Sequence, residues 1–362
     1  MTYKFNSSRR SVLKGTAVAT GALAAPAVLS KAWAAEPIKV SSYGGYFEDM
    51  LAEYAYPEFT KATGIEVQTV SQPGGFEWFV QLKTSIAAGS PAVDVTMGGY
   101  GSILRAPEVL IPIDESQVPN LANVPDYLIQ RTADGTPITC PVLAWYATLV
   151  TNTELFPTTP TSWADAWDPK FEGELGWGRN IDSSYLLDIV AATFFGGNDI
   201  MATDEGLMTC MNKAAELKDN VRLWFRDEGQ FQAMLQSGEL NGGQYYHDVT
   251  QVMIMDGFPV TSTFPKEGGV IDFGSWGLVQ GTDKIDACQE FMNWSVSPEA
   301  QTSITDNLWT APVLPRDMLP NLSDESFNRA SSTIEPIVPN YEVYVNKGDW
   351  LGEKWNELLS GV

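Results

Sequence analysis

Tyrosines beside paired glycines are the residues of this chain best suited to binding chemistry. They occur in Tyr43-Gly44-Gly45-Tyr46 and in Gly98-Gly99-Tyr100-Gly101, where the glycines indicate exposed loops rather than helix faces. Ring faces hold a small organic cation, at roughly 0.5–2 kcal/mol for each desolvated ring, and a carboxylate completes the charge pair. The candidate residues for such a site are Tyr43, Gly44, Tyr46, Tyr100, Trp145, Tyr245, Trp276 and Trp309, with Asp182 among the available carboxylates.

The same glycine pairs allow a different chemistry. Backbone amides in glycine loops that open helices hold anions such as carboxylates. Arg179 or Arg226 would add a bidentate pair to an anion held in this way. A ligand with both kinds of contact would be a zwitterion, such as an amino acid, a γ-amino acid or a betaine.

Catalytic and metal-binding frameworks are scarce in the sequence. The single histidine, His247, is next to Asp248, but neighbours on a strand or loop usually point apart and do not form a triad. No Gly-x-Ser-x-Gly elbow or phosphate-binding loop is present. One histidine and three scattered cysteines exclude the common zinc frameworks. We predict a protein that binds without catalysis, cofactor or metal. A glycosidase with paired carboxylates remains open, since 45 acidic residues always supply candidates.

The length and the net charge of the chain limit the kinds of partner that it can bind. The 362 residues carry a formal charge of −23, with 22 Lys and Arg against 45 Asp and Glu. Such a chain lacks the basic surface that nucleic acid requires and would be repelled by anionic lipid. The length suggests about two lobes. Because Cys140, Cys210 and Cys288 are far apart and odd in number, we interpret them as small buried hydrophobic residues.

The N-terminal residues 1–34 have the layout of an export signal. They contain five basic residues and no acidic ones, and Ser8-Arg9-Arg10-Ser11-Val12-Leu13-Lys14 resembles the twin-arginine consensus, with Val12 where Phe is usual. An apolar run over 15–29 and a small-x-small site at Ala32-Trp33-Ala34 follow. Removing this segment leaves 17 basic residues and a charge of −28. We expect a monomer, free in the periplasm, that the twin-arginine machinery exports.

The mature chain alternates strands and helices. The patterns predict strands at 38–41, 65–70 and 93–97, and helices at 47–63 and 76–88. Further helices are expected at 184–195, 206–217 and 225–235, with strands near 148–151 and 270–279. Strands that alternate with helices indicate a mostly parallel sheet, whose ligands lie beyond the carboxyl ends of the strands. Both glycine pairs fall at that edge.

The two strands near 148–151 and 270–279 would be the passages between two lobes. The predicted division has residues 35–147 as the first segment of lobe 1, 148–268 as lobe 2 and 269–320 as the second segment of lobe 1. Residues 321–362 form a helical C-terminal segment that the sequence assigns to neither lobe.

Several segments together resemble a known family. They are Ile38-Lys39-Val40-Ser41-Ser42-Tyr43-Gly44-Gly45-Tyr46-Phe47, the Phe59-x-x-x-Thr63-Gly64-Ile65-x-Val67 block, Asp94-Val95 and Pro265-Lys266-Glu267-Gly268-Gly269. In this order and spacing, they are similar to the solute-binding proteins of ABC importers, of the spermidine/putrescine type. The resemblance implies a two-lobed α/β type II periplasmic binding protein, in which each lobe is a mostly parallel sheet flanked by helices and hinge strands join the lobes. Its lobes would close on a polyamine-like solute in an aromatic cleft and then dock on a membrane permease.

The resemblance also suggests roles for individual residues. Tyr43 and Tyr46 match aromatic positions after the first strand, and Asp248 would be the carboxylate that holds an ammonium. Polyamine receptors carry another carboxylate after the Pro-Lys-Glu-Gly segment. A gap-free comparison places Gly274 there, with Asp272 two residues before it, which leaves a second terminal amine without a partner. A relative of the same fold that binds ferric iron would use tyrosines such as Tyr245, and the purified protein would then be coloured.

Overall fold

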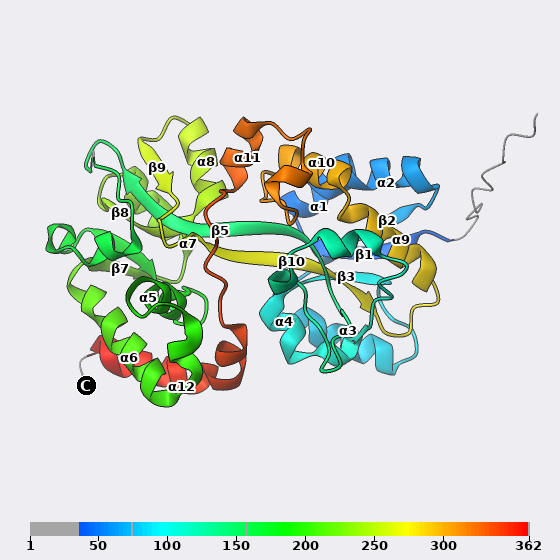
Figure 1. Cartoon of the computed structure of the whole chain (residues 1–362), viewed down its shortest axis with the longest axis horizontal. Helices are drawn as coiled ribbons and strands as arrows, with labels where there is room; N and C mark the ends of the chain where they lie inside the picture. The colour runs from blue at the N-terminus through cyan, green and yellow to red at the C-terminus, as the bar shows by residue number, and fades with distance from the viewer. Residues whose placement is uncertain (1–35, 74, 157, 361–362) are drawn as a thin grey trace, which may run out of the picture. The chain divides into compact units, whose positions relative to one another are not determined.

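The computed structural model of the protein describes residues 36–73, 75–156 and 158–360 (Figure 1). Ala35–Val362 form one compact unit, and the fold below is that of this unit alone. The predicted export signal, residues 1–34, lies outside the described residues.

The N-terminal half of the unit contains a parallel three-stranded arrangement in the order β2-β1-β3. Its strands are β1 (Ile38–Tyr43), β2 (Val67–Gln72) and β3 (Val95–Gly99). Its helices are α1 (Tyr46–Met50), a π-helical segment (Leu51–Ala55), α2 (Tyr56–Thr63), α3 (Glu77–Ala87) and α4 (Tyr100–Arg105). The expected alternation is confirmed. Gly64 ends α2 with a φ of 78°, a conformation that glycine adopts without steric cost.

A second parallel arrangement follows further along the chain, in the order β8-β6-β7. Its strands are β6 (Leu175–Gly178), β7 (Val221–Phe225) and β8 (Gly242–Tyr246). Its helices are α5 (Leu186–Phe194), α6 (Asp204–Ala215), α7 (Glu228–Gln236) and α8 (His247–Met255). The helix predicted from residue 225 begins later, because Phe225 still belongs to β7 and Asp227 caps α7 by accepting a hydrogen bond from the Gln230 amide.

Two long antiparallel strands join the halves (Figure 1). They are β5 (Cys140–Asn152) and β10 (Val270–Val279); β10 also pairs with β3, and β5 with β8. One sheet of ten strands results, in the order β2-β1-β3-β10-β5-β8-β6-β7, with β4 (Leu110–Ile111) on β10 and β9 (Val260–Thr263) on β5. The predicted α/β fold of two lobes joined by hinge strands is therefore confirmed, and the joining strands are antiparallel.

The C-terminal helices are α9 (Ile285–Ser295), α10 (Pro298–Leu308), α11 (Asp324–Ala330) and α12 (Tyr341–Ser360). Helix α12 contacts α4 of the N-terminal half and α6 of the other half. Its buried residues Tyr344, Leu351 and Trp355 join the hydrophobic core around α5 and α6. The segment that the sequence assigned to neither lobe thus touches both halves.

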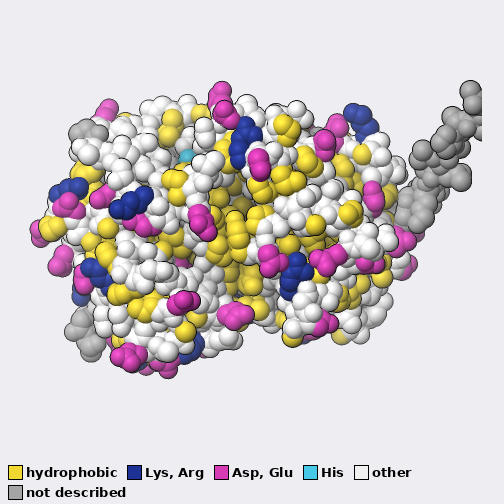
Figure 2. Space-filling model, in the orientation of Figure 1, with side chains coloured by type: hydrophobic (Ala, Val, Ile, Leu, Met, Phe, Trp, Pro, Cys, Tyr) yellow, Lys and Arg dark blue, Asp and Glu magenta, His cyan; other side chains and the backbone are white. Residues whose placement is uncertain are grey.

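On the face that Figure 2 shows, Asp and Glu side chains are dispersed among polar and apolar side chains and do not form one large acidic patch. Cys140, Cys210 and Cys288 are buried thiols, as the sequence suggested. Within the described ranges, no helix is both long enough and apolar enough to cross a membrane.

Candidate functional site

An aspartate on the joining strand β10 forms the centre of the candidate site. Asp272 accepts hydrogen bonds from the hydroxyls of Tyr185, at 2.5 Å, and Tyr341, at 2.7 Å. Its Oδ1 also accepts the Phe273 amide at 2.8 Å. The three chain segments that meet here lie far apart in sequence, so the cluster exists only in the folded protein.

Local structure explains how each hydroxyl reaches the carboxylate. Tyr185 immediately precedes α5 and has a φ of 53°, a strained conformation for a residue with a side chain. Tyr341 is the first residue of α12, and Asp188 on α5 holds the start of this helix in place. The Oδ1 of Asp188 accepts a hydrogen bond from the Asn340 amide at 2.7 Å, and its Oδ2 accepts one from the Tyr344 hydroxyl. Burial raises the pKa of Asp188 to about 7.

Aromatic rings surround Asp272. The rings of Tyr100 and Tyr341 stack with centroids 4.6 Å apart and an angle of 18° between their planes. Phe273 packs edge-on against both, at 5.9 Å and 6.3 Å. Burial, followed by the negative charge of Asp272, raises the pKa of Tyr43, which places this phenol within electrostatic reach of the carboxylate.

A cavity of about 230 Å³ opens beside this cluster. Its lining includes Tyr100, Arg105, Asp182, Tyr185, Asp272 and Tyr341. Two carboxylates against one guanidinium give this lining a formal charge of −1. Burial raises the pKa of Asp272, while the hydrogen bonds from Tyr185 and Tyr341 act in the opposite direction. Among the described residues no Lys or Arg forms an ion pair with Asp272.

A second cavity of about 140 Å³ lies at the carboxyl ends of β6, β7 and β8. It shares Ser183 with the first cavity. Arg179, Arg226 and Glu228 line it, together with Tyr245 and Tyr246. Burial raises the pKa of Tyr246, and the charges of Glu228 and Asp272 raise it further.

Four of the predicted site residues lie close to Asp272. Tyr100 and Asp182 line the same cavity, and Tyr43 is within reach of its charge. Trp145 on β5 is the register partner of Asp272 on β10, which puts the two side chains on the same face of the sheet. Gly44 lies exposed in the turn after β1. The side chain of Tyr46 is outside the described part of the structure.

Tyr245 lies at the second cavity instead, and Asp248 is in the lining of neither cavity. Tyr245 lines the second cavity, is 2% exposed and accepts a hydrogen bond from the Gln232 amide at 2.5 Å. Asp248, in the first turn of α8, has a buried Oδ1 without a hydrogen-bond partner in the described structure. Burial, more than the nearby charge of Glu228, raises the pKa of Asp248 to about 6.

Trp276 and Trp309 are remote from both cavities. Trp276 is 1% exposed and packs against Phe291 in the core, with ring centroids 5.3 Å apart. Trp309 already has an internal cation over its ring, because the Arg329 guanidinium lies 4.5 Å from the centroid.

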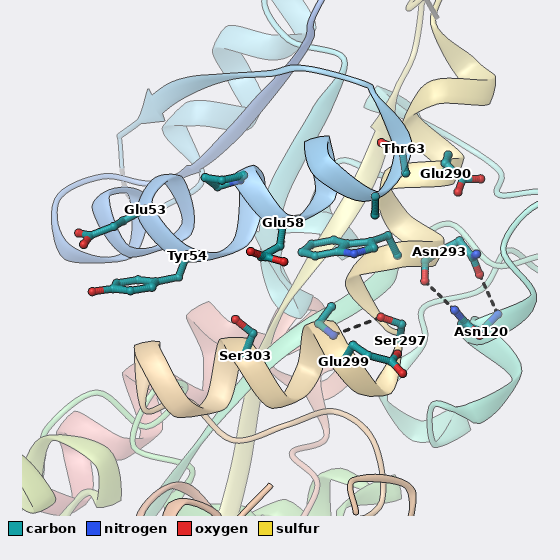
Figure 3. A pocket seen from close by; sticks show the side chains of 14 residues that line it. Glu53, Tyr54, Glu58, Thr63, Asn120, Glu290, Asn293, Ser297, Glu299 and Ser303 are labelled. Atoms are coloured by element: carbon teal, nitrogen blue, oxygen red, sulfur yellow. Dashed lines mark hydrogen bonds between the residues drawn. The ribbon is translucent and has the colours of Figure 1, made fainter. Parts of the chain in front are cut away.

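A larger cavity lies elsewhere, as a groove of about 680 Å³ between α2 and α10 (Figure 3). Glu53, Glu58, Glu290 and Glu299 line it, and hydrogen bonds between Asn120 and Asn293 close one end. All these residues belong to the N-terminal half and its covering helices. The groove therefore contains residues of one half only, whereas the cluster around Asp272 contains residues of both halves.

Sequence reasoning missed Tyr185, Tyr341 and the central role of Asp272. One signal was available for Asp272, because it is the only charged residue in the otherwise apolar and small segment Val270–Val279. A charge within a buried strand usually has a specific partner or function. For Tyr341 no local signal existed, since its position depends on how α12 docks.

Comparisons with known proteins agree with this architecture. Residues 55–316 match the family model of the bacterial extracellular solute-binding proteins. The spermidine/putrescine-binding periplasmic protein of Escherichia coli is 25% identical over 306 residues, 82% of this chain and 84% of that protein. A Salmonella typhimurium protein with the provisional name of 2-aminoethylphosphonate-binding periplasmic protein is 26% identical over 326 residues, 86% of this chain and 88% of its own length.

A solved structure supports the fold independently. The crystal structure of an ABC transporter protein from Clostridium perfringens superposes with a TM-score of 0.75 at 19% identity, covering 89% of this chain and 99% of the other. Both sequence relatives are named as periplasmic proteins, which confirms the location predicted from the sequence. The chain therefore belongs to the bacterial extracellular solute-binding proteins, the substrate-binding components of ABC transporters.

Proposed function

We propose that the protein captures a small amine-bearing, polyamine-like solute in the cavity beside Asp272 and delivers it to an inner-membrane permease. The observation that carries this proposal is the carboxylate of Asp272, which lines a cavity without any Lys or Arg ion pair among the described residues. Removing a carboxylate from water is costly unless it is paired, and an ammonium group of the ligand would supply the missing charge.

The surrounding rings suit the same ligand. Tyr100 lines the cavity and stacks on Tyr341, so its face and edges bound the space next to the carboxylate. A cation over such a ring gains roughly 0.5–2 kcal/mol when water is excluded. The spermidine/putrescine-binding relative supports an amine as the recognised group.

Binding without catalysis fits the state of His247. The residue is 3% exposed, its Nδ1 lies 2.8 Å from the Ser262 hydroxyl, and its Nε2 lies 3.2 Å from the Asn328 carbonyl oxygen. Burial lowers the pKa of His247 to about 4. These contacts give the ring a packing and hydrogen-bonding role, which supports a receptor rather than a hydrolase.

The proposal includes the predicted organisation and export of the chain. Residues 35–147 with 269–320, and residues 148–268, would act as lobes that close about β5 and β10, because a ligand that contacts both lobes favours the closed state. Arg9 and Arg10 would direct export by the twin-arginine route. The receptor would work as a monomer.

Calorimetric titration of the purified protein with spermidine, putrescine and monoamines tests the proposal. Asp272→Asn should weaken the best amine by at least about 2 kcal/mol, roughly thirtyfold, because a desolvated charge pair is lost. Asp248→Asn, titrated in parallel, tests whether the other candidate carboxylate binds the ammonium group. The exposed Asp306→Asn serves as the matched control. Unchanged affinity in Asp272→Asn, with a loss in Asp248→Asn, would move the ammonium site to α8.

A further inference from the structure

The second cavity has the opposite electrostatic character to the first. Two guanidinium groups, Arg179 and Arg226, line it against one carboxylate, Glu228, so that its formal charge is +1 rather than −1. In a chain with twice as many acidic as basic residues, two arginines in one small cavity are unusual. The pair lies at the ends of neighbouring parallel strands, since Arg179 follows β6 and Arg226 follows β7.

Arg226 is available to a ligand. It is exposed, and its guanidinium forms no hydrogen bond or ion pair with the described residues. Arg179 is half-buried and donates one hydrogen bond, from Nη2 to the Asn356 Oδ1 at 3.1 Å. A guanidinium has five donors, so most of those on Arg179 remain for other acceptors.

Two polar side chains of this cavity, on largely buried residues, also have no hydrogen-bond partner in the described part of the chain. Ser184 is 2% exposed and lines the cavity, yet its Oγ has no hydrogen-bond partner within the described ranges. Gln244 is 5% exposed, and its side-chain amide likewise makes no hydrogen bond to a described residue. Buried polar groups are normally paired, and leaving one unpaired destabilises the fold. Both groups can donate to an anionic oxygen.

We propose that this second cavity binds an acidic group of the same solute, a carboxylate or phosphonate, and that the amine-bearing ligand is therefore an amino acid or aminophosphonate. The inference rests on the proposed function, because it assumes that the amine binds at Asp272. Ser183 lines both cavities, so they are neighbours, and one short ligand would reach from Asp272 to the arginines.

Glu228 does not cancel this preference. Its Oε2 accepts a hydrogen bond from the Tyr245 hydroxyl at 3.3 Å, and burial raises its pKa above the usual value for glutamate. It therefore has a partner within the protein, whereas Arg226, Ser184 and Gln244 have none among the described residues. The donors that lack partners are those that an anion requires.

Matched ligands test the inference directly. The purified protein is titrated with 4-aminobutyrate, 2-aminoethylphosphonate, putrescine, n-propylamine and butyrate. Putrescine and 4-aminobutyrate differ mainly in a second ammonium or a carboxylate at the far end. We expect the better of the two acid-bearing amines to bind at least tenfold more tightly than putrescine or n-propylamine.

Arg226→Gln links the effect to the cavity. It should weaken the acid-bearing ligand at least tenfold and leave n-propylamine unchanged within twofold. Arg222→Gln is the control, because this exposed arginine on β7 donates to the Glu239 carbonyl oxygen and does not line the cavity. Equal losses for both ligands in Arg226→Gln would overturn the inference, since the arginine would then act on folding or closure alone.

The outcomes separate this inference from the proposed function. If putrescine binds as tightly as, or more tightly than, both acid-bearing amines, the inference is wrong and the amine site stands. If butyrate binds as well as 4-aminobutyrate and Asp272→Asn has no effect, the amine site is wrong and the acid site stands. If none of the probes binds, both are wrong.

Discussion

Asp272 shows how a single residue gains its properties from its neighbours. Tyr185 and Tyr341 each donate a hydrogen bond to it, which favours the ionised carboxylate, but burial has the larger effect and raises its pKa. The phenols stabilise the charge without neutralising it. A carboxylate in this state binds a cation strongly, because the cation relieves the cost of burial that the phenols only partly offset.

Ligand affinity should therefore depend on pH through Asp272. Because burial raises the pKa of this carboxyl, it takes up a proton at a higher pH than an ordinary aspartate, and the protonated form cannot pair with an ammonium. The affinity for an amine should fall as the pH is lowered through the acid range. Binding near the lower end should release protons, which calorimetry detects in buffers of different ionisation enthalpy.

Asp272→Asn should reduce the number of protons released when the amine binds, because asparagine carries no titratable proton. Asp248, whose pKa is raised to about 6, would account for any remainder. An affinity that stays constant over this pH range in the unmodified protein would contradict the assignment of the ammonium to either carboxylate.

At the scale of single residues, the sequence predicted part of the site. Glycine loops marked Tyr43 and Tyr100, which do lie near Asp272. Trp276 has the same composition cues, yet it packs in the core, because the inward or outward direction of a strand residue depends on what covers each face of the sheet. The local sequence does not show which elements pack on each face of the sheet.

Among the elements, β3 shows why glycine at a strand end is not always a ligand loop. A Cβ at Gly98 would lie 2.6 Å from the Phe79 ring and 2.9 Å from Ile103, so this glycine allows α3 and α4 to pack against the strand. Gly101, in the first turn of α4, has no atom within 4 Å of the same position and an ordinary φ. Gly98 and Gly101, two of the three glycines of this motif, therefore have different structural roles.

This contrast predicts opposite effects on stability. Gly98→Ala should destabilise the protein by roughly 1–3 kcal/mol through overpacking. Gly101→Ala should be neutral or stabilising by up to about 1 kcal/mol, because alanine favours the helix. Urea unfolding of both variants measures the difference. Equal stabilities would show that Phe79 and Ile103 move aside without cost.

The sequence predicted most elements and their order, because the apolar periodicity of the helices and strands is strong. It did not predict the extent of β5, which begins at Cys140 rather than near residue 148. It also did not predict that α12 would touch α4 and α6. Both features depend on contacts between segments more than 100 residues apart, which no local pattern records.

At the scale of the whole molecule, the dominant property is its charge of −23. Acidic side chains are dispersed over the face in Figure 2, and the ion pairs between exposed residues, such as Lys61 with Glu58, contribute little each. Long-range repulsion between the carboxylates therefore outweighs local attraction.

Salt should stabilise the protein for this reason. Raising NaCl from about 10 mM to about 300 mM shortens the screening length from roughly 30 Å to below 8 Å and should raise Tm by a few degrees. Differential scanning calorimetry measures the shift, and KCl at equal ionic strength should give the same result, which separates screening from specific ion binding. A Tm that falls with salt would mean that the local ion pairs dominate.

The pairing of β3 with β10 has a consequence for synthesis on the ribosome. Residues 95–99 acquire their antiparallel partner only when residues 274–278 have been made, and β1 and β2 lie beyond β3 in the same sheet. The N-terminal half cannot be completed while the chain is shorter than this, although domains of many proteins fold in order as they emerge. A nascent chain that ends before β10 would leave an edge of β3 unpaired, and such edges invite association with other chains. Folding of the N-terminal half must therefore wait for about three-quarters of the chain, and a chaperone that shields β3 would act during that interval.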